Sequence, residues 1–155
     1  EAFRIFNYAR TRPDGVFSAL LFASWFFFVG GLYLAQLPHF AKDTLGVDHL
    51  VLTFFMIVFS CGIAFGGLLN NALLRGRVVA SFVPVSALVI GVASFDLYWA
   101  AQPYVDLPVL FKQGYLIDLR AFLSYWSGWR VTLDLFLIAF AGGLYVVPLK
   151  AIIQD

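Results

Sequence analysis

Residues Trp129–Gln154 read W-R-V-T-L-D-L-F-L-I-A-F-A-G-G-L-Y-V-V-P-L-K-A-I-I-Q, an apolar stretch that contains one acid, two adjacent glycines and one proline. A helix of this length can cross a hydrocarbon core of about 30 Å, at about 1.5 Å per residue. Acidic side chains are costly in hydrocarbon and usually face a protein interior or a wet cavity. Glycine and proline allow close approach or bending. We therefore predict that this helix lines a transport pathway rather than serving as a simple anchor.

The composition places the chain among integral membrane proteins. Hydrophobic residues make up 62% and charged residues 12%, against about 45–50% and about 25% in soluble domains. The net charge of +1 says nothing about nucleic acid, but the sequence has no basic patch, so we expect no nucleic-acid partner. The single cysteine, Cys61, excludes an internal disulfide and any CxxC metal or redox motif. We expect no cofactor and no metal site.

The expected fold is an all-α, polytopic membrane helix bundle with four transmembrane helices. Long apolar segments separated by short polar ones predict the spans at residues 14–37, 50–74, 78–101 and 130–153. The second span contains Gly62-x-x-x-Gly66 followed by Gly67, a small-residue face suited to close helix packing.

Two segments outside the spans have their own patterns. Residues 1–13 mix arginines with aromatic residues, which suits either a cytoplasmic amphipathic linker at the membrane surface or a disordered linker. Residues 102–129 form the predicted outer loop, in which Ile117–Trp126 could form a short helix in the membrane interface. The chain begins with glutamate, and we expect it to be part of a longer protein.

Loop charges indicate the orientation. With four spans, both ends lie on one side of the membrane, together with six basic residues: Arg4, Arg10, Arg12, Arg75, Arg77 and Lys150. The other side carries four: Lys42, Lys112, Arg120 and Arg130. Because lysine and arginine favour the cytoplasmic side, both ends are predicted to be cytoplasmic.

The first and fourth spans share a short string. Phe28-Val29-Gly30-Gly31-Leu32-Tyr33 matches Phe140-Ala141-Gly142-Gly143-Leu144-Tyr145, and a proline follows each copy, at Pro38 and Pro148. The two spans run in opposite directions, as expected for an inverted-topology repeat. Coincidence is the alternative, because these residue types are common in this chain.

Over residues 16–154 the chain resembles the C-terminal half of lysophospholipid transporters of the major facilitator superfamily, including the transporter portions of fused transporter–acyltransferase proteins. The resemblance is carried by Ser24-Trp25-Phe26, Gln36-Leu37-Pro38, Phe59-Ser60-x-Gly62-Ile63, Val83-Pro84, Asp96-Leu97-Tyr98, Gly128-Trp129-Arg130, and above all Asp134-Leu135 through Gly142-Gly143 to Val147-Pro148-Leu149 and Gln154. Asn70-Asn71, Lys150 and the connection 102–129 depart from the family pattern.

This resemblance implies helices seven to ten of a twelve-helix transporter whose N-terminal half lies elsewhere. It implies movement of a lysophospholipid, such as lysophosphatidylethanolamine, across the bacterial inner membrane. An acyltransferase could be fused outside this fragment. Besides the substrate, the expected partners are membrane lipids and the missing transporter half.

Candidate functional residues follow from the spans and the resemblance. The candidates for substrate binding are Trp25, Tyr33, Gln36, Asp134 and Tyr145. The candidates for gating or for a structural role are Gly30, Gly31, Asp96, Arg130, Gly142, Gly143 and Pro148. Arg130 and Asp134 are four residues apart and can meet on one helix face, so a fixed ion pair is the structural alternative for both. Trp25 and Gln36 could equally be interfacial residues.

Other function classes fit less well. Two acids in apolar spans, Asp96 and Asp134, are reminiscent of the paired carboxylates of aspartyl proteases, but both lie near span ends and no catalytic motif accompanies them. We therefore expect no enzymatic activity in this fragment. A non-catalytic membrane subunit or scaffold, or a carrier of another small amphiphile, remains an alternative.

Overall fold

The computed structural model describes residues 15–74, 82–105 and 116–154, and this part of the chain is almost entirely helical. The elements are α2 (Val16–His39), the π-helical turn η1 (Phe40–Thr44), α3 (His49–Leu74), α4 (Val83–Val105), α5 (Leu119–Ser124) and α6 (Trp126–Gln154). The predicted linker 1–13, the basic turn at residues 75–77 and the middle of the predicted outer loop lie outside the described residues.

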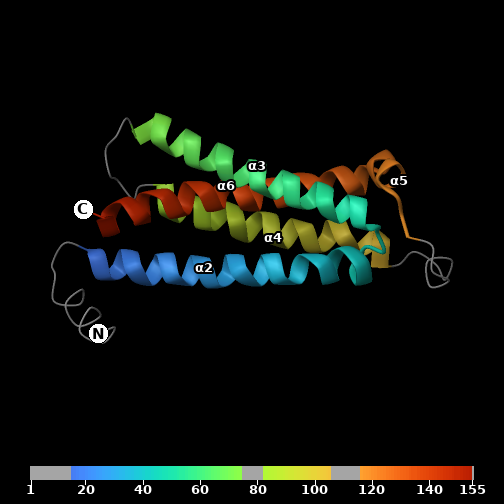
Figure 1. Ribbon diagram of the computed structural model, residues 1–155, viewed down its shortest axis with the longest axis horizontal. Coiled ribbons are helices and arrows are strands. Elements are labelled where there is room, and N and C mark those ends of the chain that lie inside the picture. The colour runs from blue at the N-terminus through green and yellow to red at the C-terminus, as the bar shows by residue number, and fades with distance from the viewer. Residues whose placement is uncertain (1–14, 75–81, 106–115, 155) are drawn as a thin grey trace.

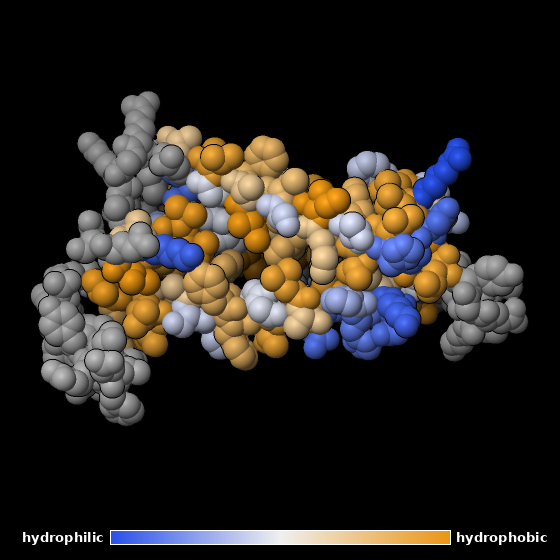
Figure 2. Space-filling model, viewed as in Figure 1, coloured by the Kyte–Doolittle hydropathy of each residue, from blue (hydrophilic) through white to orange (hydrophobic). Residues whose placement is uncertain are grey.

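Four of these helices, α2, α3, α4 and α6, are long and apolar enough to cross a membrane. The predicted all-α bundle with four membrane-length helices is therefore confirmed. Large apolar side chains cover the outer surface, for example Phe22, Phe28, Leu68 and Val92 (Figure 2). Such a surface would cause aggregation in water but is expected where the surroundings are lipid.

The bundle is built around α6, which packs against α2, α3 and α4. Of the residues in the most apolar stretch of α6, 61% are buried within the bundle. In the corresponding stretch of α2 only 11% are buried, so α2 is the outlying helix, the one least enclosed by the others. The start of α2 and the end of α6 lie at the same end of the bundle, and the two helices are antiparallel (Figure 1). α5 lies at the opposite end.

Glycines bring α3 and α6 into backbone contact. A Cβ added at Gly143 of α6 would lie 2.5 Å from the Ile63 carbonyl oxygen and 2.9 Å from the Gly67 nitrogen. A Cβ added at Gly62 would lie 2.7 Å from the Ala139 Cβ, and one at Gly66 would clash with the Phe140 carbonyl. The glycine face of the second span is therefore the surface on which α6 packs.

A backbone bridge joins the segment before α3 to the segment before α5, at the end of the bundle where α5 lies. Gly46 takes a positive φ of 65°, which glycine adopts without strain. The next residue, Val47, then forms an isolated parallel bridge with Ile117. The Asp48 carboxylate accepts hydrogen bonds from two backbone N–H groups of α3, and Asp118 accepts one from α5. These caps explain where both helices begin.

Two helix ends differ from the sequence-based boundaries. α4 includes Pro103 and runs to Val105, although the third span is predicted to end at residue 101. A proline near the last turn removes only one intrahelical hydrogen bond, so the helix continues past it. α6 begins at Trp126 rather than at residue 130, because its first turn packs against α5: the Trp129 Nε1–H donates to the Leu123 carbonyl at 2.9 Å.

Candidate transport cavity and charged cluster

An apolar cavity of about 290 Å³ lies between the four long helices. Figure 2 shows a hollow near the middle of the molecule. The lining combines residues from α2, α3, α4 and α6: Phe26, Phe27, Val29, Gly30, Gly31, Tyr33, Leu34, Phe59, Ile63, Ile90, Ile138, Ala139 and Gly142. Ligand pockets in proteins start at about 300 Å³ and are mostly apolar, so this cavity has the size and chemistry of a small hydrophobic site.

Glycines from both copies of the repeated string line this cavity. A Cβ added at Gly30 or Gly31 would meet nothing within 4 Å, so the absence of side chains there leaves open space. On the opposite wall, a Cβ added at Gly142 would lie 2.9 Å from the Phe26 ring. Gly143 instead faces α3. The structure thus brings together three of the four predicted glycines.

Tyr33 supplies the polar group of the cavity wall. Its hydroxyl is 2.5 Å from the Ser94 Oγ of α4. The single hydroxyl hydrogen of Ser94 is directed to the Ile90 carbonyl at 2.5 Å, so Tyr33 is the donor. This hydrogen bond ties the outlying α2 to α4 beside the cavity.

Tyr145 lies in the contact between α2 and α6 rather than in the cavity lining. Its buried ring stacks on Phe26, with ring centroids 5.1 Å apart. Ala19, Ala23 and Leu149 complete this small apolar cluster. Pro148, one turn along α6, is also fully buried. Because Phe26 also lines the cavity, the stack forms its boundary toward the end where α6 finishes.

Trp25 and Gln36 face outward from the described bundle. The Trp25 side chain is 65% exposed and packs beside Phe28 of its own helix. Gln36 is also exposed. Neither residue lines the cavity.

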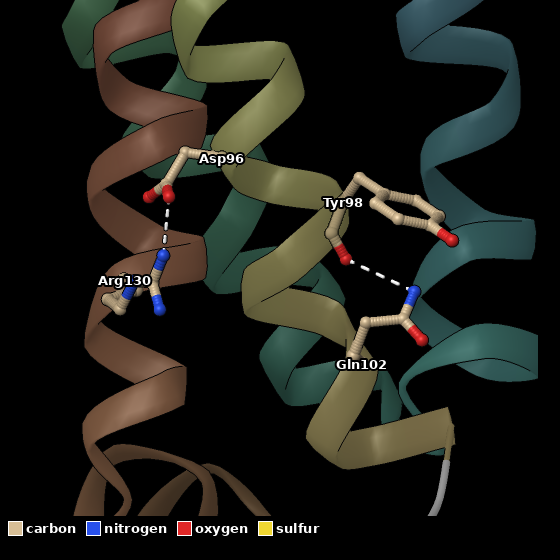
Figure 3. Close-up of polar contacts among 4 residues, drawn as sticks. All are labelled: Asp96, Tyr98, Gln102 and Arg130. Carbon is tan, nitrogen blue, oxygen red and sulfur yellow. Dashed lines mark hydrogen bonds and ion pairs between the residues drawn. The ribbon is translucent and has the colours of Figure 1, made fainter.

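Charged residues gather at a separate place, between α4 and α6. Arg130 of α6 donates from Nη2 to the Asp96 carboxylate of α4, and Figure 3 shows the two side chains pointing toward each other. Both are partly exposed, at 38% and 40% of their side-chain surface. The Tyr98 carbonyl and the Gln102 side chain, drawn in the same view, interact only within α4.

Asp134 lies one turn along α6 from Arg130 and is 4% exposed. Its Oδ2 is buried without a hydrogen-bond partner among the described residues. Asp96 and Arg130 are the charged groups that act on it. The sequence spacing suggested an Arg130–Asp134 pair, but the arginine is bonded to the neighbouring helix instead. Asp96 lies near the predicted end of the third span, at residue 101, and Arg130 lies at the predicted start of the fourth, so the order of the spans could have predicted their meeting.

The sequence analysis did not identify Ser94 as the partner of Tyr33, because serine is common in apolar helices and carries no signal by itself. Within the described part of the chain, no group of three or more His, Cys, Asp and Glu side chains is placed to hold a metal ion. Comparison with known protein families, curated proteins and solved structures found no match to this chain.

Proposed function

We propose that the chain is part of a membrane transporter that moves a lysophospholipid, such as lysophosphatidylethanolamine, between the leaflets of the bacterial inner membrane. The observation that supports this most is the apolar cavity walled by Gly30 and Gly31 on one side and Gly142 on the other. The proposal assigns this cavity to the acyl chain of the lipid. The sequence resemblance to lysophospholipid transporters of the major facilitator superfamily points the same way.

The chemistry of the cavity favours a lipid over a sugar or an ion. Its lining is apolar apart from Tyr33, whose hydroxyl already bonds to Ser94. A sugar needs several hydrogen-bonding groups and an ion needs charged or carbonyl ligands, because burying either without partners is costly. An acyl chain needs neither. The shallow packing of α2 against the bundle also suits lateral entry of a lipid.

The mechanism proposed is alternating access, in which helix bundles rock about a central site. The antiparallel α2 and α6, each with its glycine pair, would form facing walls in such a motion (Figure 1). The chain would supply helices seven to ten, with both of its ends in the cytoplasm. The remaining helices would belong to the longer protein.

The proposal is tested by lipid transfer in liposomes that contain the purified full-length protein. A lysophosphatidylethanolamine with a fluorescent acyl chain is added to one leaflet, and its movement to the other is followed by extraction with albumin. Gly30→Leu places a side chain in the cavity without meeting atoms within 4 Å at Cβ, so it should reduce transfer at least fivefold while the protein stays folded.

The matched control is Gly91→Leu. Gly91 lies in α4, is exposed, meets nothing within 4 Å at an added Cβ and does not line the cavity. It should transfer lipid at the wild-type rate. Equal transfer by the two variants, or no transfer by the wild-type protein, would contradict the proposal. A scaffold subunit would show no transfer in any variant.

A further inference from the structure

The charged cluster between α4 and α6 contains one more negative than positive side chain. Arg130 is bonded to Asp96, and the Oδ2 of Asp134 has no hydrogen-bond partner among the described residues although Asp134 is almost fully buried. We propose that Asp96, Arg130 and Asp134 form a proton-binding site, in which Asp134 holds the proton while Arg130 pairs with Asp96. This inference does not depend on the identity of the transported molecule.

One positive side chain among the described residues acts on Asp134. Asp96 of α4 and Arg130 of α6 are the charged groups that act on it. Val131 and Leu135, which flank Asp134 along α6, belong to an apolar core that also contains Val51 and Phe55 of α3. One guanidinium can neutralise only one carboxylate, so a proton is the remaining way to remove the second charge.

The positions of Asp96 and Asp134 permit Arg130 to exchange one carboxylate partner for the other. Arg130 and Asp134 are four residues apart on α6, within reach of each other on one helix face. When Asp134 loses its proton, Arg130 can leave Asp96 and pair with Asp134. Asp96 is then left unpaired, but it is partly exposed, whereas Asp134 is buried. Proton release at one carboxylate therefore breaks an ion pair between two helices.

This exchange links proton binding to the contact of α4 with α6. In the protonated state the Arg130–Asp96 pair crosses the interface (Figure 3). In the deprotonated state the pair lies within α6 alone, and α4 is less firmly held. The cluster can thus convert occupancy by a proton into a change of helix packing.

Infrared difference spectroscopy on the full-length protein in liposomes tests the site directly, without measuring transport. The carbonyl stretch of a protonated carboxylic acid should be present at neutral pH in the wild-type protein. Asp134→Asn should remove it. Asp96→Asn should also remove it, because Arg130 is then free to pair with an ionised Asp134. Asp118→Asn is the control, since Asp118 is an exposed helix cap that asparagine can replace, and it should leave the band unchanged.

The absence of the band in the wild-type protein would overturn the proposal. So would its full retention in Asp134→Asn or, should that variant fail to fold, in Asp96→Asn. Exchange of K⁺ for Na⁺ at constant pH should not alter the band, and its loss in Na⁺ would identify a sodium site instead of a proton site. Because the measurement follows a carboxyl band and not the transfer of a lipid, these outcomes stand apart from the success or failure of the transfer experiment.

Discussion

Gly143 of α6 is the position where a single methyl group should do most damage to helix packing. A Cβ at this residue would lie 2.5 Å from the Ile63 carbonyl oxygen, 2.9 Å from the Gly67 nitrogen and 3.1 Å from the Gly66 carbonyl carbon. All three atoms belong to the α3 backbone, so no side-chain rotation can relieve the clash. Gly143→Ala must push the two helices apart.

The size of the effect follows from these distances. Cβ contacts shorter than 3.0 Å are essentially never seen, so the helices must separate by about 0.5 Å near Gly143. A gap of this size already forfeits about a quarter of the dispersion energy of the atoms facing it. Overpacking typically costs about 1–3 kcal/mol. Replacing a helical glycine by alanine returns about 0.5–1 kcal/mol. The difference between the two ranges is a net loss of about 0–2.5 kcal/mol, with its centre near 1 kcal/mol.

The assay is the free energy of unfolding of the full-length protein, measured by denaturant titration in one detergent. Gly67→Ala is the matched control on the facing helix, because its Cβ would meet only the Val147 Cγ2 at an ordinary 3.6 Å. That variant should be as stable as the wild-type protein or slightly more stable. The packing argument is wrong if Gly143→Ala unfolds at the same denaturant concentration as Gly67→Ala or at a higher one.

Three further changes test other contacts. Tyr33→Phe removes the hydrogen bond to Ser94. Because such bonds between membrane helices average about 0.6 kcal/mol, the free energy of unfolding should fall by about that amount. Adding Ser94→Ala to Tyr33→Phe should lower it little further. Arg130→Gln removes the ion-pair partner of Asp96 and should lower the thermal stability. The addition of Asp96→Asn should restore part of that stability, and a double variant less stable than Arg130→Gln would contradict the ion pair. Asp118→Ala removes the cap of α5 and should lower the free energy of unfolding by about 1 kcal/mol, whereas Asp118→Asn should not.

The architecture could be predicted because hydrocarbon leaves the backbone few choices. A long apolar segment must satisfy its own hydrogen bonds as a helix, so segment length and hydropathy fix the number of spans. The small-residue pattern Gly62-x-x-x-Gly66 also predicted a close helix contact, and α6 packs there. The third span was predicted to end at residue 101, before Pro103, whereas α4 continues to Val105, since a proline near a helix end need not end it.

The candidate site was harder to predict because a helix that is apolar on all sides does not reveal which face meets its neighbours. The sequence left Trp25 and Gln36 open between substrate binding and an interfacial position. Both residues are exposed, while Gly30 and Tyr33 of the same helix line the cavity. The four-residue spacing along one helix likewise suggested Asp134 as the partner of Arg130. The actual partner lies on α4, and only the arrangement of helices in space reveals it.

The central claim is that the cavity between α2 and α6 holds the acyl chain of a lysophospholipid. Photolabelling of the reconstituted full-length protein tests it most directly, with a lysophosphatidylethanolamine that carries a photoreactive group in its acyl chain and mass spectrometry to locate the label. The account predicts label on Ile90 and Ile138 that unlabelled lysophospholipid displaces and that Gly30→Leu abolishes. Label confined to outward residues such as Val92, and unaffected by Gly30→Leu, would contradict it.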